Sequence, residues 1–153
     1  MPVKRTDLIR VERAIAKEGT AYWFNEGDDW YISESHFVLR VNKDIFDYLK
    51  KKLDGRKRKV EWKELGSLKN FFMNIDGILV RDRKPGKLPD KREVLVLEQS
   101  TYKVVIDRSF IVTTDGQYLF YTNGATKPVY QVIGDYELVN MILPIANPEV
   151  VYD

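Results

Sequence analysis

The chain of 153 residues contains no cysteine, which excludes a disulfide framework, a thiolate zinc site and a cysteine nucleophile. Its single histidine, His36, excludes a metal site made of several histidines. The nine glycines never form the GxGxxG or GxxxxGK patterns that cradle phosphates, so we expect neither the common nucleotide-dependent enzymes nor a bound cofactor. No apolar run approaches the roughly 18 residues of a membrane span, and the N-terminus lacks a secretory apolar region. We therefore expect a cytoplasmic protein without a membrane partner.

Apolar and aromatic residues are plentiful, at 44% and 12% of the chain, which predicts a packed core rather than disorder. The length predicts one domain over residues 1–153. Within it we expect residues 1–36 to form an extension of one helix and an aromatic hairpin, and residues 37–153 to form the main body. The predicted fold class is α+β, with a mostly antiparallel sheet and two or three helices.

The net charge of +2 hides an uneven distribution along the chain. Residues 1–49 carry seven basic and nine acidic side chains, residues 50–92 carry fifteen and six, and residues 93–153 carry three and eight. A basic middle between two acidic ends is typical of a protein with an anionic partner. The alternative is that the basic segment neutralises the acidic ends within the fold or in an assembly.

Two helices are indicated by apolar residues at steps of three and four. The first, at residues 4–18, has Thr6 or Asp7 as its N-cap and Gly19 as its stop. The second follows Asn42 as N-cap and ends at Gly55, with lysines in its last turn that oppose the helix dipole. The apolar faces consist of Leu8, Val11 and Ile15 in the first helix and Ile45, Phe46, Leu49 and Leu53 in the second.

Runs rich in β-branched and aromatic residues, bounded by turn residues, predict the strands. They lie at 21–24, 30–32, 37–41, 60–62, 77–80, 94–97, 102–106, 118–122, 129–133 and 138–143. Residues 65–73 predict a short helix or a buried turn. Residues 81–92 hold two prolines, a glycine and six basic side chains, and predict an exposed loop.

The C-terminal hairpin has the most specific pattern. A strand opening at Pro128 turns at Gly134-Asp135 into a strand that ends at Leu143-Pro144. This resembles the closing hairpin of a DNA sliding-clamp domain. The resemblance implies two β-α-β-β-β halves whose helices face DNA, with residues 102–106 and 118–122 as strands of the second half and residues 107–111 opening its helix.

A faint internal repeat fits that implication. Val41-Asn42-Lys43-Asp44-Ile45-Phe46 aligns with Ile106-Asp107-Arg108-Ser109-Phe110-Ile111 at an offset of 65 residues. Each segment is a strand end, a helix-capping residue, a base, a small polar residue and two apolar residues. The two interpretations are a true duplication and a chance match.

Seven of the ten residues from Lys50 to Lys59 are basic, which predicts contacts to nucleic-acid phosphates without sequence readout. Trp62 and Phe71 are close enough in sequence to offer a stacking surface for single strands. The alternative is a solvated helix end with a basic loop. The predicted nucleic-acid-binding residues are Lys50, Lys51, Lys52, Arg56, Lys57, Arg58 and Lys59.

The aromatic hairpin offers a second candidate surface. Trp23, Trp30 and Tyr31 are predicted to bind a partner if their rings face outward. The alternative is core packing under the N-terminal helix. His36 is expected to be a partly buried structural residue, because neighbouring serines in a strand do not build a nucleophile–base pair.

One short motif points to an enzyme. Val60-Glu61-Trp62-Lys63 has the apolar-Glu-x-Lys form of a large metal-dependent nuclease superfamily. That superfamily also needs an aspartate at the end of an earlier strand, whereas Asp54 follows a predicted helix. We therefore expect a non-enzymatic, nucleic-acid-associated accessory protein with a clamp-like fold that contacts DNA without sequence specificity. The alternatives are a protein-interaction or self-association module without nucleic-acid binding, and a Mg²⁺-dependent nuclease.

Overall fold

The structure, a computed structural model, describes residues 4–66, 77–112, 118–133, 137–146 and 148–152. It confirms the α+β class. The chain forms two compact units: Met1–Asn74 with Val112–Asp115, and Ile75–Ile111 with Gly116–Asp153. The prediction that residues 1–153 fold as one domain stays a prediction.

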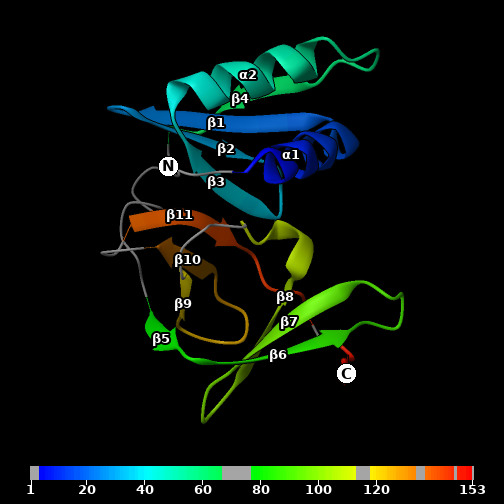
Figure 1. Cartoon of the computed structure of the whole chain (residues 1–153), viewed down its shortest axis with the longest axis vertical. Coiled ribbons are helices and arrows are strands. Elements are labelled where there is room, and N and C mark those ends of the chain that lie inside the picture. The colour runs from blue at the N-terminus through cyan, green and yellow to red at the C-terminus, as the bar shows by residue number, and fades with distance from the viewer. Residues whose placement is uncertain (1–3, 67–76, 113–117, 134–136, 147, 153) are drawn as a thin grey trace. The chain divides into compact units, whose positions relative to one another are not determined.

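The first unit contains two helices against a sheet whose strand order is β4-β1-β2-β3 (Figure 1). The three strands β1 to β3 form an antiparallel meander, and β4 lies parallel to β1. Because successive side chains of a strand point to opposite faces, Trp23, Trp30 and Trp62 share the face of this sheet that packs on α2. The elements are α1 (Arg5–Glu18), β1 (Thr20–Glu26), β2 (Asp29–Ser33), β3 (Phe37–Val41), α2 (Lys43–Asp54) and β4 (Glu61–Glu64).

Helix α2 begins and ends where the sequence predicts. The Asn42 side chain accepts a hydrogen bond from the backbone N–H of Ile45 at 2.8 Å, and Gly55 follows the last turn. Phe46, Leu49 and Leu53 are buried on the face toward the sheet. Within the described part of the chain, no helix has the length and apolar character needed to cross a bilayer.

Helix α1 begins at Arg5, before the predicted N-cap, so the expected N-cap at Thr6 or Asp7 is wrong. Its N-cap is Lys4, which makes no side-chain capping bond. Asp7 is 1% exposed and forms an ion pair with Arg10, one helical turn away, so its carboxylate is engaged inside the helix. The predicted stop is confirmed, because Gly19 adopts the left-handed conformation with φ 84°.

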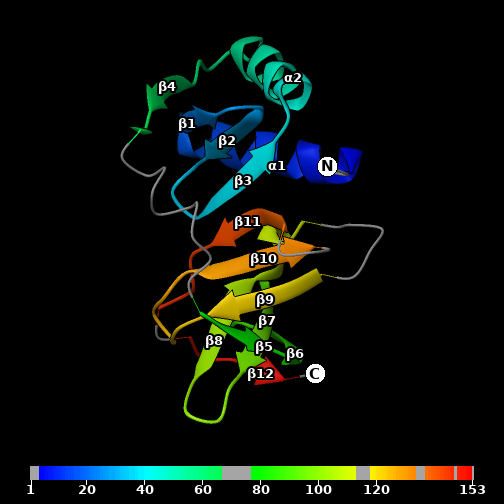
Figure 2. The ribbon, with the colours of Figure 1, turned by 90° about the vertical axis from the view of Figure 1, so that its left-hand side faces the viewer.

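The second unit contains two sheets (Figure 2). Their strand orders are β11-β10-β9-β5 and β12-β6-β7-β8. Among the described residues, both sheets contribute to the larger of two buried apolar clusters, which includes Leu97, Ile106, Phe120 and Ile142, and a smaller cluster contains Val94, Val96 and Val105. The elements are β5 (Ile78–Val80), β6 (Asp82–Lys87), β7 (Glu93–Glu98), β8 (Lys103–Asp107), the 3-10 helix η2 (Arg108–Phe110), β9 (Tyr118–Thr122), β10 (Val129–Ile133), β11 (Glu137–Ile142) and β12 (Val151–Tyr152).

The C-terminal hairpin is confirmed as an antiparallel pair of β10 and β11, with a register shift between Gln131 and Val132. The helix expected from residue 107 is present only as η2, three residues long and capped by the Asp107 side chain. Most of the helix or turn predicted at residues 65–73 lies outside the described residues, which omit 67–76. The predicted turn at Gly134-Asp135 also lies outside them.

The exposed loop predicted at residues 81–92 is wrong, because β6 occupies residues 82–87 and pairs along its whole length with β7. Its first four residues are exposed, so charged side chains are tolerated there. The neighbour on its other side, β12, pairs only with Gly86 and Lys87. Pro85 has no partner in β12, so its missing N–H removes no hydrogen bond between β6 and β12.

The repeat suggested by the sequence extends to the strand pairing. In the first unit Trp30 lies opposite Val41 and Ser33 opposite Val38. Adding 65 to each number gives Leu95 opposite Ile106 and Glu98 opposite Lys103, the register of β7 and β8. Each hairpin is preceded by an antiparallel strand and followed by a side-chain-capped helical turn. This correspondence favours duplication over a chance match.

We predict that Phe46→Ala lowers the free energy of unfolding by about 3–5 kcal/mol, because it leaves a cavity among the tryptophans under α2. Tyr48→Ala, on the same helix but 39% exposed, is the matched control and is expected to cost far less. The measurement is urea unfolding followed by tryptophan fluorescence. Equal losses in the two variants would contradict this account of the packing.

Candidate nucleic-acid interface

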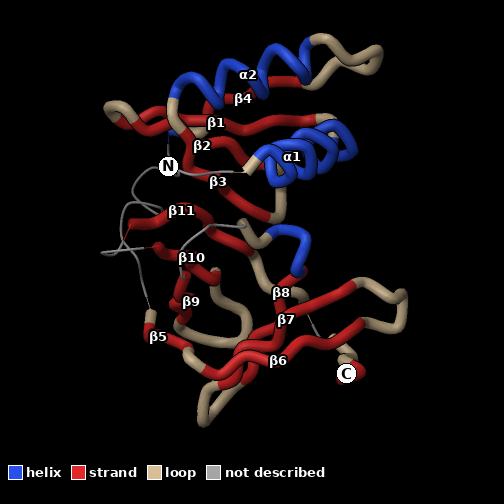
Figure 3. The backbone as a smooth tube through the Cα atoms, in the orientation of Figure 1, coloured by secondary structure: helices blue, strands red, loops and turns tan. Residues whose placement is uncertain are grey.

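The seven basic residues predicted from the sequence lie at the C-terminal end of α2 and in the loop that leads to β4 (Figure 3). Lys51 and Lys52 occupy the last turn, where cations oppose the negative end of the helix dipole. Arg56 to Lys59 follow directly after the C-cap Gly55. The sequence grouping is thus also a spatial grouping.

Three of these cations already have partners. Arg56 donates to the Glu12 carboxylate of α1 through Nη2 at 2.5 Å and Nε at 3.1 Å. The Lys50 ammonium lies 3.0 Å from Asp54 Oδ2, and Lys59 donates to the Asp54 backbone carbonyl. These bonds tie α1, α2 and the loop together, and leave the three cations less available for an external anion.

The other four cations of the cluster have no carboxylate partner in the described part of the chain. Lys51, Lys52, Lys57 and Arg58 are exposed, and in the described ranges none of them forms an ion pair. Cations that no carboxylate neutralises give a surface its positive potential, and they contact phosphates at no cost in broken salt bridges. The described cluster therefore divides into structural cations and free ones.

Aromatic rings lie beside two cations of the cluster, the paired Lys50 and the free Lys52. The Lys50 ammonium stands 4.8 Å from the centroid of the Trp62 ring, and the Lys52 ammonium 5.8 Å from that of Tyr48. The Trp62 indole N–H donates to Asp54 Oδ1 at 3.0 Å. Tyr48 is 39% exposed, so its ring is open to a stacking partner. Phe71, the other predicted stacking residue, lies outside the described residues.

The sequence interpretation missed Tyr48 and the role of Asp54, although a signal existed for both. Lys50 and Asp54 are four residues apart in one helix, as are Tyr48 and Lys52, and this spacing places side chains next to each other. Asp54 is hydrogen-bonded by Lys50 and then by Trp62, which holds the pKa of its carboxyl below the ordinary value against a smaller opposing effect of burial.

The aromatic hairpin is not an exposed patch. Trp23 and Trp30 are half-buried, stack on each other with centroids 5.7 Å apart, and both pack against Phe46 of α2. Tyr31 is 4% exposed and stacks on Phe24 at 4.3 Å on the other face of the sheet. The rings thus pack as the core alternative foresaw, although mainly under α2 rather than under the N-terminal helix. Partner binding by Trp23, Trp30 and Tyr31 stays a prediction.

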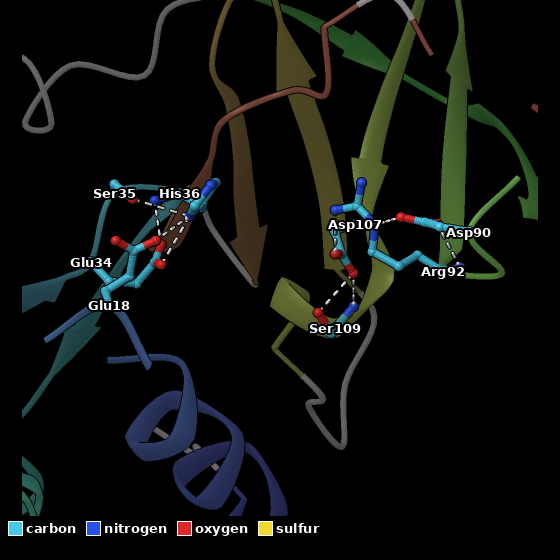
Figure 4. A network of polar contacts seen from close by, with 8 residues as sticks. All are labelled: Glu18, Glu34, Ser35, His36, Asp90, Arg92, Asp107 and Ser109. Carbon is cyan, nitrogen blue, oxygen red and sulfur yellow. Dashed lines mark hydrogen bonds and ion pairs between the residues drawn. The ribbon is translucent and has the colours of Figure 1, made fainter. Parts of the chain in front are cut away.

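The basic residues of 81–92 belong to the second unit, where several are engaged. Arg83 lies over the rings of Tyr118 and Phe120, at 5.1 and 5.5 Å from their centroids. Arg92 pairs with Asp90 and lies 3.7 Å from Asp107 (Figure 4). Three others, Arg81, Lys87 and Lys91, are exposed and form no ion pair within the described ranges, so this second group also holds free cations.

His36 differs from its prediction as a partly buried residue, because its side chain is 54% exposed. Ser35 Oγ lies 3.2 Å from His36 Nδ1, a contact that the sequence interpretation had discounted (Figure 4). Glu34 Oε2 faces the same ring nitrogen at 2.9 Å. A hydrolytic triad needs hydroxyl and carboxylate on opposite nitrogens of the ring, so this arrangement is not one.

The nuclease motif lies on the edge strand β4. Glu61 and Lys63 are exposed and their charged groups are 3.8 Å apart. Trp62 and Asp54 contact each other, and Trp62 points to the opposite face of the strand from Glu61. Asp54 therefore does not converge with Glu61 on a common metal position and does not supply the aspartate that the nuclease motif needs.

We predict that Asp54→Asn destabilises the protein near neutral pH and has little effect in acid. The lowered pKa means that the aspartate contributes stability above its unfolded value of about 3.9, and loses it as pH falls through the lower folded value. Urea midpoints of both proteins measured from neutral pH into acid check this. Asp47→Asn, an exposed change in the same helix, is the control. A gap between wild type and Asp54→Asn that widens in acid would contradict the assignment.

Comparison of the chain with protein-family models, with curated proteins and with solved structures found no significant match. The geometry described above is therefore the basis for any functional conclusion. It consists of four exposed, unpaired cations and two aromatic rings at one end of α2.

Proposed function

We propose that the first unit binds the sugar–phosphate backbone of nucleic acid without reading sequence, through Lys51, Lys52, Lys57 and Arg58. The observation that carries this proposal is the group of four uncompensated cations at one helix end, one of which, Lys52, lies over the Tyr48 ring. A positive surface with adjoining aromatic faces is the combination used by proteins that bind nucleic acid non-specifically. The three paired cations then stabilise the local structure more than they contact the ligand; they are Lys50, Arg56 and Lys59.

The number of free cations sets the expected salt dependence. If all four contact phosphates, the affinity for duplex DNA falls about 150-fold between roughly 50 and 200 mM salt. The same change on single strands is about 50-fold, because fewer counterions are released per contact. Stacking on Tyr48 adds affinity that depends little on salt and is specific to unpaired bases.

The clamp-like interpretation is part of the proposal. It is supported by the C-terminal hairpin, by the duplicated hairpin register, and by the lysines that α2 carries where a clamp half has its DNA-facing helix. The short η2 supplies only Arg108 at the corresponding place, so the first unit is expected to bind more tightly than the second.

The test is the double variant Lys57→Glu with Arg58→Glu, compared with wild type by fluorescence anisotropy on labelled single- and double-stranded DNA. We expect at least roughly tenfold weaker binding at the lowest salt, and a salt slope reduced by about 1.8 on duplex, because two phosphate contacts are lost. Lys43→Glu with Lys127→Glu makes the same change in net charge at exposed positions that are not part of the cluster and is the control. Equal weakening in both double variants would contradict a localised site.

The uneven charge along the sequence favours a second candidate, in which the basic segment docks on acidic surfaces of another copy. Such a protein binds DNA weakly or not at all, and its mass rises with concentration. Sedimentation equilibrium without DNA at low and high salt separates the two. A monomer at every concentration would remove self-association, and a salt-sensitive oligomer without DNA affinity would replace the nucleic-acid proposal.

A further inference from the structure

Three potential metal ligands converge in the first unit (Figure 4). Glu18 is the last residue of α1, and Glu34 and His36 lie in the connection between β2 and β3. One ligand atom from each side chain lies within 4.8 Å of the other two. His36 Nδ1 is 2.9 Å from Glu34 Oε2 and 3.5 Å from Glu18 Oε1. No motif in the sequence predicts this group, because Glu18 is 16 residues from Glu34 and belongs to a different element.

The Glu34 carboxylate is the unusual member, because its side chain is only 3% exposed. Its Oε1 accepts hydrogen bonds from the backbone N–H groups of His36 and Phe37. These bonds fix the carboxylate and leave Oε2 directed at the imidazole. A buried carboxylate needs a compensating positive charge, yet over the described ranges the ion-pair partner of Glu34 is His36, which is charged only when protonated, and no lysine or arginine.

The second carboxylate increases this need rather than meeting it. Glu18 brings another negative charge to the same imidazole nitrogen, and like charges this close repel. Ser35 Oγ lies 3.2 Å from that nitrogen as well. One ring nitrogen carries at most one N–H, so it cannot donate well to three oxygens at once. A cation that accepts lone pairs from nitrogen and oxygen together would resolve both conflicts.

Two of the three separations are close to those expected around a small divalent ion. Two ligands bound at about 2.1 Å on a tetrahedral ion are about 3.4 Å apart. The two distances from Nδ1, 2.9 and 3.5 Å, lie on either side of this value. The side chains of Glu18 and His36 are 39% and 54% exposed, so a fourth position faces solvent.

We propose that Glu18, Glu34 and His36 bind one divalent transition-metal ion of the zinc class, with water as the fourth ligand. The imidazole nitrogen selects this class over Mg²⁺ and Ca²⁺, which prefer oxygen ligands and more of them. The ion neutralises the buried Glu34 and joins the end of α1 to the connection between β2 and β3. This inference is independent of nucleic-acid binding, since it involves none of the cations at the end of α2.

The test is titration of the tag-free full chain with Zn²⁺ by isothermal calorimetry, followed by NMR of the imidazole. Because His36 is the only histidine, one set of imidazole resonances reports on the site without assignment. We expect one ion per chain, a shift of those resonances, and a rise in thermal stability that grows with free Zn²⁺. Mg²⁺ at the same concentration is expected to cause none of these changes.

Variants then locate the ion. Glu18→Gln and His36→Gln are changes at exposed positions and are expected to weaken Zn²⁺ binding by at least roughly tenfold. Glu26→Gln, at the far end of β1, is the control and should bind like wild type. Glu34→Gln is informative only if it folds, which circular dichroism decides. No Zn²⁺ binding, or binding unchanged in His36→Gln, would overturn the proposal and leave an ion-pair network only.

Discussion

The packing of Phe46 among three tryptophans is the interaction on which the first unit depends. Phe46 lies 4.5 Å from Trp30 and 5.9 Å from both Trp23 and Trp62, measured between ring centroids. Its partners come from β1, β2 and β4, so one side chain fixes α2 over three strands. Such aromatic contacts bury large areas and have preferred geometries. They set the direction of α2, and with it the place where its lysines emerge.

Two hairpins of the same register lead to different outcomes. The register is shared by β2–β3 and β7–β8, and a side chain that caps the next helical turn lies at the end of β3 and of β8. After Asn42 the chain forms a helix of 12 residues, whereas after Asp107 it forms η2 with three. The sequence after η2 continues with Ile111-Val112-Thr113-Thr114, and β-branched residues disfavour a helix. Within the described residues, the long helix with a basic end therefore follows β3 and not β8.

Local signals in the sequence were reliable where one element decides the outcome. The Asn42 cap and the apolar face of α2 require only helical spacing. The same reasoning failed for β6, since proline and charge suggest a loop when the partner strand is unknown. It failed for Asp7 as well, because burial beside Arg10 depends on the fold around the helix.

The α+β class, the main helix, the C-terminal hairpin and the clustering of cations at residues 50–59 were all predictable from the residue pattern. The free cations could be identified only from the folded chain, because the partner of Arg56 is Glu12, 44 residues away. The tertiary structure also brought Glu18 to His36, and turned Trp23 and Trp30 inward. Pairing between distant residues depends on how elements pack, and packing is not encoded in the spacing along any one of them.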